Sequence, residues 1–238
     1  NSADMLSLYR LLRSLGMEFA TAALHNSYYF HKTDNTITNQ TEVCGNFSKL
    51  IEWQLKEKHP KSWFRAYFNW GLINYVKGQP RLLPCEAGLV NFFVDPYGDV
   101  YPCNGLESKY WKESMGNIRT MTSFEELWRS EQAEHIRSCV RNCPKNCWMV
   151  GTAAPVMKKY VAIPMKWIIN QKIQSFSCIY PSYILNSLYL SGSSNASKVF
   201  FTYNFIISFN VYFLFSYVYL LLKIFTISNL NSVFNSFS

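Results

Sequence analysis

The chain has 238 residues, enough for one large domain or two small ones, and hydrophobic residues make up 49% of it, which is ample for a core. Its formal net charge is +8, from 23 Lys and Arg against 15 Asp and Glu, but no dense basic run stands out. Scattered positive charge of this kind is typical of a solvated surface, so we expect no nucleic-acid partner.

The N-terminal region begins with a helical pattern. Apolar residues at helical spacing predict a helix over 3–14, and Gly16 is a suitable stop. The apolar stretch 17–24 predicts a short buried strand. The polar segment that follows contains His25 and His31, for which surface or packing roles are commoner than binding roles.

Two more helices are expected before residue 80. Asn46 can cap a helix that ends near Lys58, where Pro60 interrupts the pattern. Ser62 can cap the next one, which Gly78 closes. The second helix is rich in aromatic side chains that we assign to the core: Trp63, Phe64, Tyr67, Phe68 and Trp70.

A β-hairpin is predicted next. Residues 89–94 and 99–102 have strand-like composition, and the DPYG sequence at 95–98 has Pro and Gly at turn-forming positions. Cys103 follows the second strand and Cys85 precedes the first, so the hairpin brings the two thiols to the same end.

A helix then leads to a group of three cysteines. Ser123 and Glu126 form a capping box, and the helix that they start delivers the chain to Cys139, Cys143 and Cys147. Five cysteines therefore lie within 63 positions. Unrelated buried thiols are an unlikely reason for such a density.

Disulfides, zinc and an iron–sulfur cluster are the alternatives for these thiols. The first residues show no signal-peptide pattern, so we expect a reducing, cytoplasmic setting that favours metal or cofactor binding over disulfides. Zinc ribbons usually contain two C-x₂-C knuckles, whereas here a hairpin separates the first pair and the second set reads C-x₃-C-x₃-C. This spacing favours an iron–sulfur cluster, with a structural zinc module as the alternative.

The combined pattern resembles a known family. Cys85, twelve residues, Gly98, four residues and Cys103 resemble the opening of the SPASM and Twitch auxiliary-cluster domains, which follow the barrel of radical S-adenosylmethionine (radical SAM) enzymes. The resemblance continues through "MGNI", "FEELWRS" and a closing "C-x₃-CW", and covers about residues 81–150.

The resemblance implies one auxiliary [4Fe–4S] cluster. By position, Cys85 and Cys103 match its first two ligands, and Cys143 and Cys147 match the closing pair, while Cys139 could replace Cys143 or stay unligated. A full SPASM domain has a C-x₂-C-x₅-C-x₃-C run and a further cysteine for a second cluster. This chain departs from that run, which favours the single cluster of a Twitch domain.

The expected fold class is α+β, in three segments. Residues 1–80 are expected to be the C-terminal remnant of a partial TIM barrel plus a helical connector, 81–174 the cluster domain, and 175–238 a hydrophobic tail. The chain starts at Asn1 and lacks the C-x₃-C-x₂-C motif that defines radical SAM enzymes and binds the cluster that cleaves S-adenosylmethionine. The solitary Cys44 cannot replace this motif. We therefore expect a fragment, with S-adenosylmethionine and a second cluster bound only by the full-length parent.

Family resemblance also suggests what such a domain does. The auxiliary cluster would exchange an electron with a substrate radical, or hold the domain together and position the substrate. Family members act on peptides, proteins and small metabolites, and an electron donor such as a flavodoxin or ferredoxin is the expected partner. Whether this chain is itself an enzyme therefore depends on its missing part.

The tail has a composition of its own. Residues 199–222 are 24 residues without a charge, long enough to span a bilayer. One interpretation is a membrane anchor, which would make the chain a membrane-associated iron–sulfur electron carrier. The other is a non-native read-through of an AT-rich reading frame, which gives the same bias towards Phe, Asn, Ile, Tyr and Ser.

Overall fold

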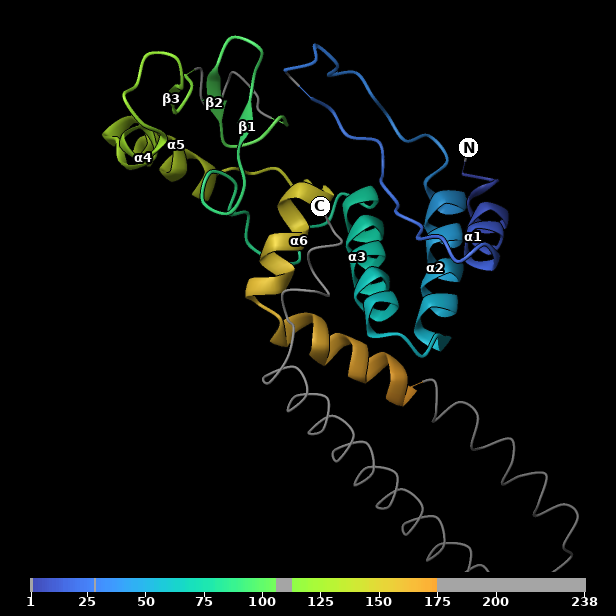
Figure 1. The fold of residues 1–238 in the computed structure, drawn as a ribbon. Coiled ribbons are helices and arrows are strands. Elements are labelled where there is room, and N and C mark those ends of the chain that lie inside the picture. The colour runs from blue at the N-terminus through green and yellow to red at the C-terminus, as the bar shows by residue number, and fades with distance from the viewer. Residues whose placement is uncertain (1, 28, 106–112, 175–238) are drawn as a thin grey trace, which may run out of the picture. The chain divides into compact units, whose positions relative to one another are not determined.

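The computed structural model describes residues 2–27, 29–105 and 113–174. Contacts divide the chain into two units, Asn1–Ile169 and Asn170–Ser238. The described part of the first unit combines helices with a small three-stranded antiparallel sheet, which confirms an α+β fold (Figure 1).

The N-terminal half of the first unit is helical. Helix α1 is amphipathic, and the predicted helix over 3–14 is confirmed with its start two residues later. Helices α2 and α3 make the most extensive contact between elements and form an antiparallel helical hairpin, because only three residues connect them. The bounds are α1 Met5–Ser14, α2 Gln40–Lys56 and α3 Pro60–Val76.

The starts of α2 and α3 differ from the predicted ones. Helix α2 begins six residues before the predicted cap Asn46, whose side chain instead donates to the carbonyl of Ser2. Helix α3 is capped by His59, whose Nδ1 accepts from the Lys61 N–H, with Pro60 in the first turn. The predicted cap Ser62 lies inside α3 and donates to Glu57 instead.

The predicted strand over 17–24 is wrong, since none of these residues pairs in a ladder. The chain here runs alongside α3, which supplies side chains in place of a neighbouring strand. The guanidinium of Arg65 donates to the Phe19 carbonyl at 2.9 Å, and the Tyr75 hydroxyl donates to the Leu24 carbonyl at 3.0 Å. Backbone carbonyls that bond side chains are satisfied without a sheet.

The predicted hairpin is present, with shorter strands. Its strands are β1 Phe93–Val94 and β2 Asp99–Tyr101, and β3 Gly116–Asn117 completes the sheet in the order β1-β2-β3. In the turn, the Asp95 carboxylate accepts the N–H groups of Tyr97 and Asp99, both at 2.9 Å. Gly98 has a φ of +90°, which a side chain would strain.

The helix predicted after residue 123 is two helices. Ser123 caps α4 Phe124–Arg129 and Ser130 caps α5 Glu131–Arg141 through a bond to the Ala133 N–H. The extended backbone of Ser130, with ψ of 154°, separates them. Helix α6 Val150–Lys159 follows, and residues 162–174 are helical as well.

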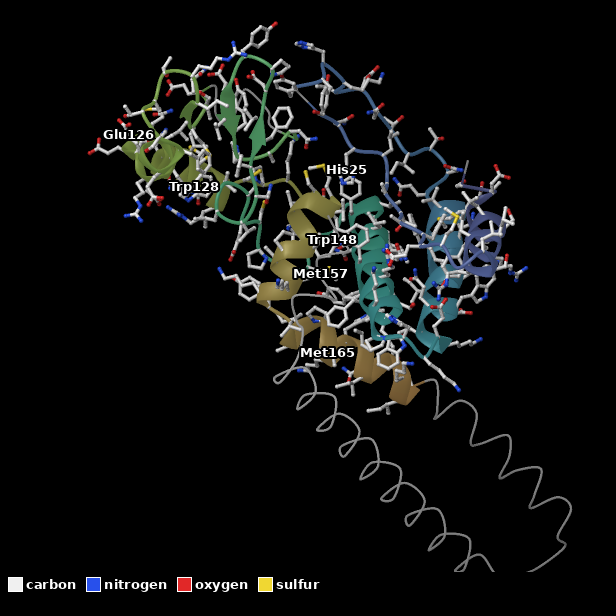
Figure 2. All side chains as sticks on the ribbon, viewed as in Figure 1. His25, Glu126, Trp128, Trp148, Met157 and Met165 are labelled. Atoms are coloured by element: carbon white, nitrogen blue, oxygen red, sulfur yellow. The ribbon has the colours of Figure 1, made fainter. Side chains whose placement is uncertain are left out.

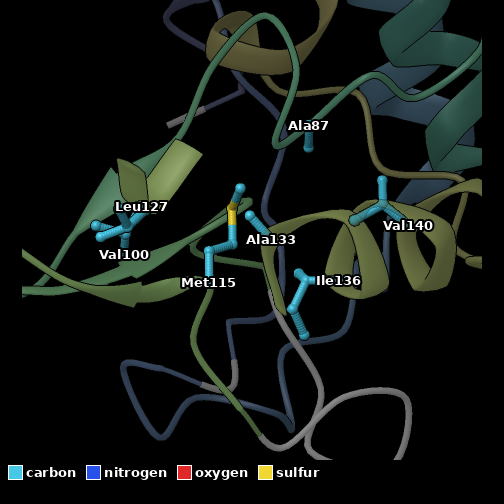
Figure 3. Close-up of a cluster of buried hydrophobic side chains, with 7 residues drawn as sticks. All are labelled: Ala87, Val100, Met115, Leu127, Ala133, Ile136 and Val140. Carbon is cyan, nitrogen blue, oxygen red and sulfur yellow. The ribbon is translucent and has the colours of Figure 1, made fainter. Parts of the chain in front are cut away.

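A compact apolar core holds the hairpin against α4 and α5 (Figure 3). Its members come from the loop after Cys85, from β2, from the residue before β3 and from both helices. Four cysteine side chains pack against its outer edge. The core residues are Ala87, Val100, Met115, Leu127, Ala133, Ile136 and Val140.

The expected membrane segment over 199–222 lies outside the described residues. Within the ranges that the structure describes, no helix combines the length and apolar character needed to cross a bilayer.

Candidate metal centre

The loop after Cys85 turns back towards the open end of the hairpin. Gly88 has a φ of +81°, and its N–H donates to the Asn91 carbonyl at 2.7 Å. The Asn91 amide then donates to the carbonyl of Pro102, next to Cys103. A side chain at Gly88 would lie 3.1 Å from the Pro102 ring, so glycine allows this close approach of the two segments that carry the thiols.

Arg137 on α5 fixes the same loop from the other side. Its Nε donates to the Gly88 carbonyl at 2.8 Å, and an Nη donates to the Trp128 carbonyl at 2.5 Å. The guanidinium also lies 4.6 Å from the centre of the Trp128 ring, a cation–π contact. Arg137 therefore joins the loop after Cys85 to α5, the helix that leads to the C-terminal cysteines.

The C-terminal cysteines lie at the end of α5 and beyond it. Cys139 is in the last turn of the helix, whereas Cys143 follows its C-cap and donates its N–H to the Val140 carbonyl. Residues 143–149, including Cys147, have no regular structure. The irregular backbone lets this segment fold back towards the hairpin instead of continuing along the helix.

The thiols of Cys85, Cys103, Cys143 and Cys147 lie close enough to influence one another's pKa values. Burial raises the pKa of Cys103 to about 12, the Gly105 N–H partly opposes this, and the nearby thiols of Cys85, Cys147 and Cys143 add to the rise. Burial likewise raises the pKa of Cys147, which also interacts with Cys143 and Cys85. Since only thiolates bind metal, loading this site must release protons.

Cys139 is not among these interacting thiols. Its sulfur lies 3.9 Å from His135 Nε2, one turn earlier on α5. Cys139 does pack against the same apolar core as Cys85, Cys103 and Cys143. Of the five predicted site residues, the structure thus brings four together electrostatically and places the fifth beside them on the helix.

The positions of the cysteines help to distinguish a single metal ion from an iron–sulfur cluster. Within the described ranges, no set of three or more His, Cys, Asp or Glu side chains is positioned to hold a single metal ion. Thiolates around one tetrahedral zinc lie about 3.8 Å apart, given Zn–S bonds of about 2.3 Å. Cluster ligands lie further apart, because several irons and sulfides stand between them. The all-thiol donor set suits a cluster.

The N-terminal segment reaches the last cysteine. His25 Nε2 accepts the N–H of Trp148, the residue after Cys147, while Nδ1 lies 2.7 Å from the Ala23 carbonyl. The ring stacks on Tyr75 of α3 at a centroid distance of 4.0 Å. Burial lowers the pKa of His25, which favours the neutral imidazole that this pair of bonds requires.

Trp148 fixes the other side of this loop. Its indole is buried against α3 (Figure 2), and its Nε1–H donates to the Phe68 carbonyl at 2.8 Å. A Cβ atom on Gly71 would lie 2.1 Å from the indole, so this helix position is open only to glycine. Trp148 therefore packs into the core directly beside Cys147.

Arg81 is a site residue that sequence reasoning missed. Its guanidinium donates to the carbonyl of Cys147 and lies in the field of the four gathered thiols. It also lines a pocket of about 350 Å³ together with Cys85 and Cys143. Its position four residues before the first cysteine, in the otherwise apolar run "RLLPC", was the available signal.

The comparison with protein families covers this region. Residues 85–148 match the SPASM iron–sulfur cluster-binding domain. The matched range runs from the first of the gathered cysteines to Trp148, and it confirms the resemblance to the SPASM/Twitch domains of radical SAM enzymes. Comparison with curated proteins and with solved structures gave no match. Residues 85–148 are called the SPASM segment below.

Proposed function

We propose that this chain is the C-terminal part of a radical SAM enzyme and that its SPASM segment holds one auxiliary [4Fe–4S] cluster. The ligands are Cys85, Cys103, Cys143 and Cys147. The observation that carries the proposal is that residues 85–148, which contain all four thiols, match an iron–sulfur cluster-binding domain. These thiols come from two stretches that a zinc knuckle would not combine.

A bound cluster supplies one-electron redox chemistry, with a potential that depends on nearby charge and hydrogen bonds. The residues of this chain prepare the site for it. Burial of Cys103 and Cys147 limits the access of water, and the Gly105 N–H favours the thiolate form of Cys103. His25 and Trp148 fix the backbone beside Cys147. These features support a site that positions substrate or exchanges an electron with it.

The proposal assigns residues 1–80 to the end of the barrel and its connector. Helix α1 and its C-cap leave an apolar face uncovered, which leaves room for a preceding element, because Leu8, Leu11 and Leu15 are 44%, 55% and 64% exposed. An apolar helix face of this kind usually packs against another element. The coding sequence upstream of Asn1 tests the assignment, which predicts a C-x₃-C-x₂-C motif there. We propose that the full-length parent then binds S-adenosylmethionine, acts on a peptide, protein or small-metabolite substrate, and receives electrons from a flavodoxin-like or ferredoxin-like donor.

The metal content of anaerobically reconstituted protein tests the cluster itself. We expect about four irons and four sulfides per chain, with a reducible absorption and EPR spectrum. The Cys103→Ala variant should lose both, and Cys139→Ala is the matched control that should keep them. One zinc without sulfide would replace the proposal with a structural zinc module. Full iron content in Cys103→Ala would overturn the ligand assignment.

A further inference from the structure

Arg81 occupies an unusual position for a cation. Its Nε donates to the Leu83 carbonyl and an Nη donates to the Thr152 carbonyl, both at 2.9 Å. The other Nη donates to the Cys147 carbonyl. The guanidinium also lies 5.2 Å from the centre of the Trp148 ring. These partners are all uncharged, and no carboxylate in the described part of the chain pairs with Arg81.

A partly buried guanidinium without a carboxylate needs another source of negative charge, because an arginine stays protonated in proteins. The four cysteines would supply it as thiolates once the cluster is bound, because binding deprotonates them. Burial lowers the pKa of Arg81, and Cys85, Cys147, Cys103 and Cys143 act in the opposite direction. Cys85 and Cys143 line the same pocket as Arg81, so the charge faces the space between the two cysteine-bearing stretches.

We infer that Arg81 is a positioning residue that raises the reduction potential of the cluster, an inference that rests on the proposed function. One-electron reduction adds one negative charge to the cluster. A fixed positive charge nearby stabilises the reduced form more than the oxidised form. The three backbone carbonyls hold the guanidinium in place, so its charge stays directed at the site in both states.

Arg141 provides a matched control. It lines the same pocket, but its guanidinium pairs with Glu134 at 2.9 Å and its side chain is 54% exposed. Solvent and the neighbouring carboxylate screen this charge. Arg81→Gln and Arg141→Gln therefore each remove one positive charge from the same pocket. Of these two charges, only that of Arg81 faces the thiols without a compensating acid.

The experiment is a redox titration of the reconstituted full chain with dithionite and mediators, followed by EPR. At a fixed potential, Arg81→Gln should lower the ratio of reduced to oxidised cluster at least tenfold, equivalent to about 59 mV for one electron. Arg81→Lys, which keeps the charge, should lower it less than threefold, and Arg141→Gln should do the same. Equal shifts in Arg81→Gln and Arg141→Gln would overturn the inference.

Iron content separates the remaining outcomes. If Arg81→Gln loses the cluster, the Arg81→Lys variant is measured instead. A cluster reduction potential near the wild-type value in Arg81→Lys would support the role of the charge. Loss of the cluster in both variants would show that Arg81 acts through its bonds to the Cys147 and Thr152 carbonyls, which overturns the inference. Wild-type protein without iron would instead remove the proposed function, whatever the Arg81 variants do.

Discussion

The α2–α3 hairpin and the SPASM segment are ordered by different means. The two helices have 17 residues each, and they bury large side chains such as Leu50, Phe64 and Tyr67 almost completely. The three strands of the SPASM segment have two, three and two residues. Strands this short are not stable without further support.

The SPASM segment gets its support from side chains that bind backbone and from the thiols. Arg137, Asn91 and Asp95 each bond main-chain groups that a longer ladder would otherwise satisfy. Its core is small and has cysteines at the edge. The helical hairpin can therefore hold its shape by packing alone, whereas the SPASM segment should depend on the group that its cysteines bind.

Removal of the cluster should therefore affect the largest part of the chain and should separate the two regions. We expect a chelator to accelerate amide hydrogen exchange at least tenfold over 85–105 and 113–148, a local loss of about 1.4 kcal/mol or more. Exchange in the cores of α2 and α3 should change less than about twofold. Mass-spectrometric hydrogen exchange measures both regions at once. The Cys103→Ala variant is the control, since it has no cluster to lose. Uniform acceleration along the chain would contradict the comparison.

A pair of glycines tests the contact between the two regions. Gly71→Ala would place a methyl group 2.1 Å from the buried Trp148 indole, and we expect a loss of about 2–3 kcal/mol from the free energy of unfolding. Gly45→Ala on α2 has nothing within 4 Å and should gain about 0.5–1 kcal/mol from its higher helix propensity. Urea denaturation measures both. A neutral effect of Gly71→Ala would mean that Trp148 does not depend on α3.

Two arginines separate buried from exposed support within the SPASM segment. Arg137→Met removes bonds to the Gly88 and Trp128 carbonyls, and we expect a loss of about 2 kcal/mol from the free energy of unfolding. Among the described residues, Arg129 pairs only with Glu125, and both side chains are at least 70% exposed, so Arg129→Met should change the free energy by less than about 0.5 kcal/mol. Thermal or urea unfolding of the two variants checks this. Similar losses in both would mean that Arg137 does not organise the loop after Cys85.

The sequence predicted the elements better than their ends. Three helices and the turn at 95–98 were found from periodicity and turn chemistry, and Ser123 caps α4 as predicted, but the caps of α2 and α3 were misplaced. Asn46 and Ser62 have capping side chains that bond elsewhere, and His59 caps α3 although histidine is an uncommon cap. The strand over 17–24 failed because apolar residues in an extended segment look alike whether their partner is a strand or a helix.

The candidate site was predicted as far as local spacing allows. The hairpin explains why Cys85 and Cys103 meet, and the break after α5 explains why Cys143 and Cys147 can join them. Local spacing could not separate Cys139 from Cys143, because this depends on where α5 ends. Contacts between distant residues were also missed: Arg81 bonds the Cys147 carbonyl 66 positions away, and His25 bonds the Trp148 N–H 123 positions away.

The smallest expected effect concerns Glu86, which joins the SPASM segment to α6. Its buried carboxylate accepts from Lys159 Nζ at 2.7 and 2.8 Å and from the Tyr160 hydroxyl at 2.5 Å. Burial raises the pKa of Glu86, but the bonds from Lys159 and Tyr160 outweigh it and lower the pKa overall. A lowered folded-state pKa means that ionised Glu86 stabilises the fold above its unfolded pKa of about 4.3. This contribution is lost as the pH falls through the folded-state value.

Glu86→Gln should therefore reduce the free energy of unfolding by about 1 kcal/mol at pH 7, and the difference should decrease as the pH falls from about 4.3 through the folded-state pKa. The effect is small because the Lys159 side chain is 54% exposed, so water competes for the pair. Urea unfolding at several pH values, in a Cys103→Ala background that has no acid-labile cluster, checks the prediction. A difference that does not decrease on acidification would show that Glu86 acts by packing rather than by charge. The contact between Glu86 and α6 would then resemble the packing of the α2–α3 hairpin. It would not resemble the polar contacts that support the rest of the SPASM segment.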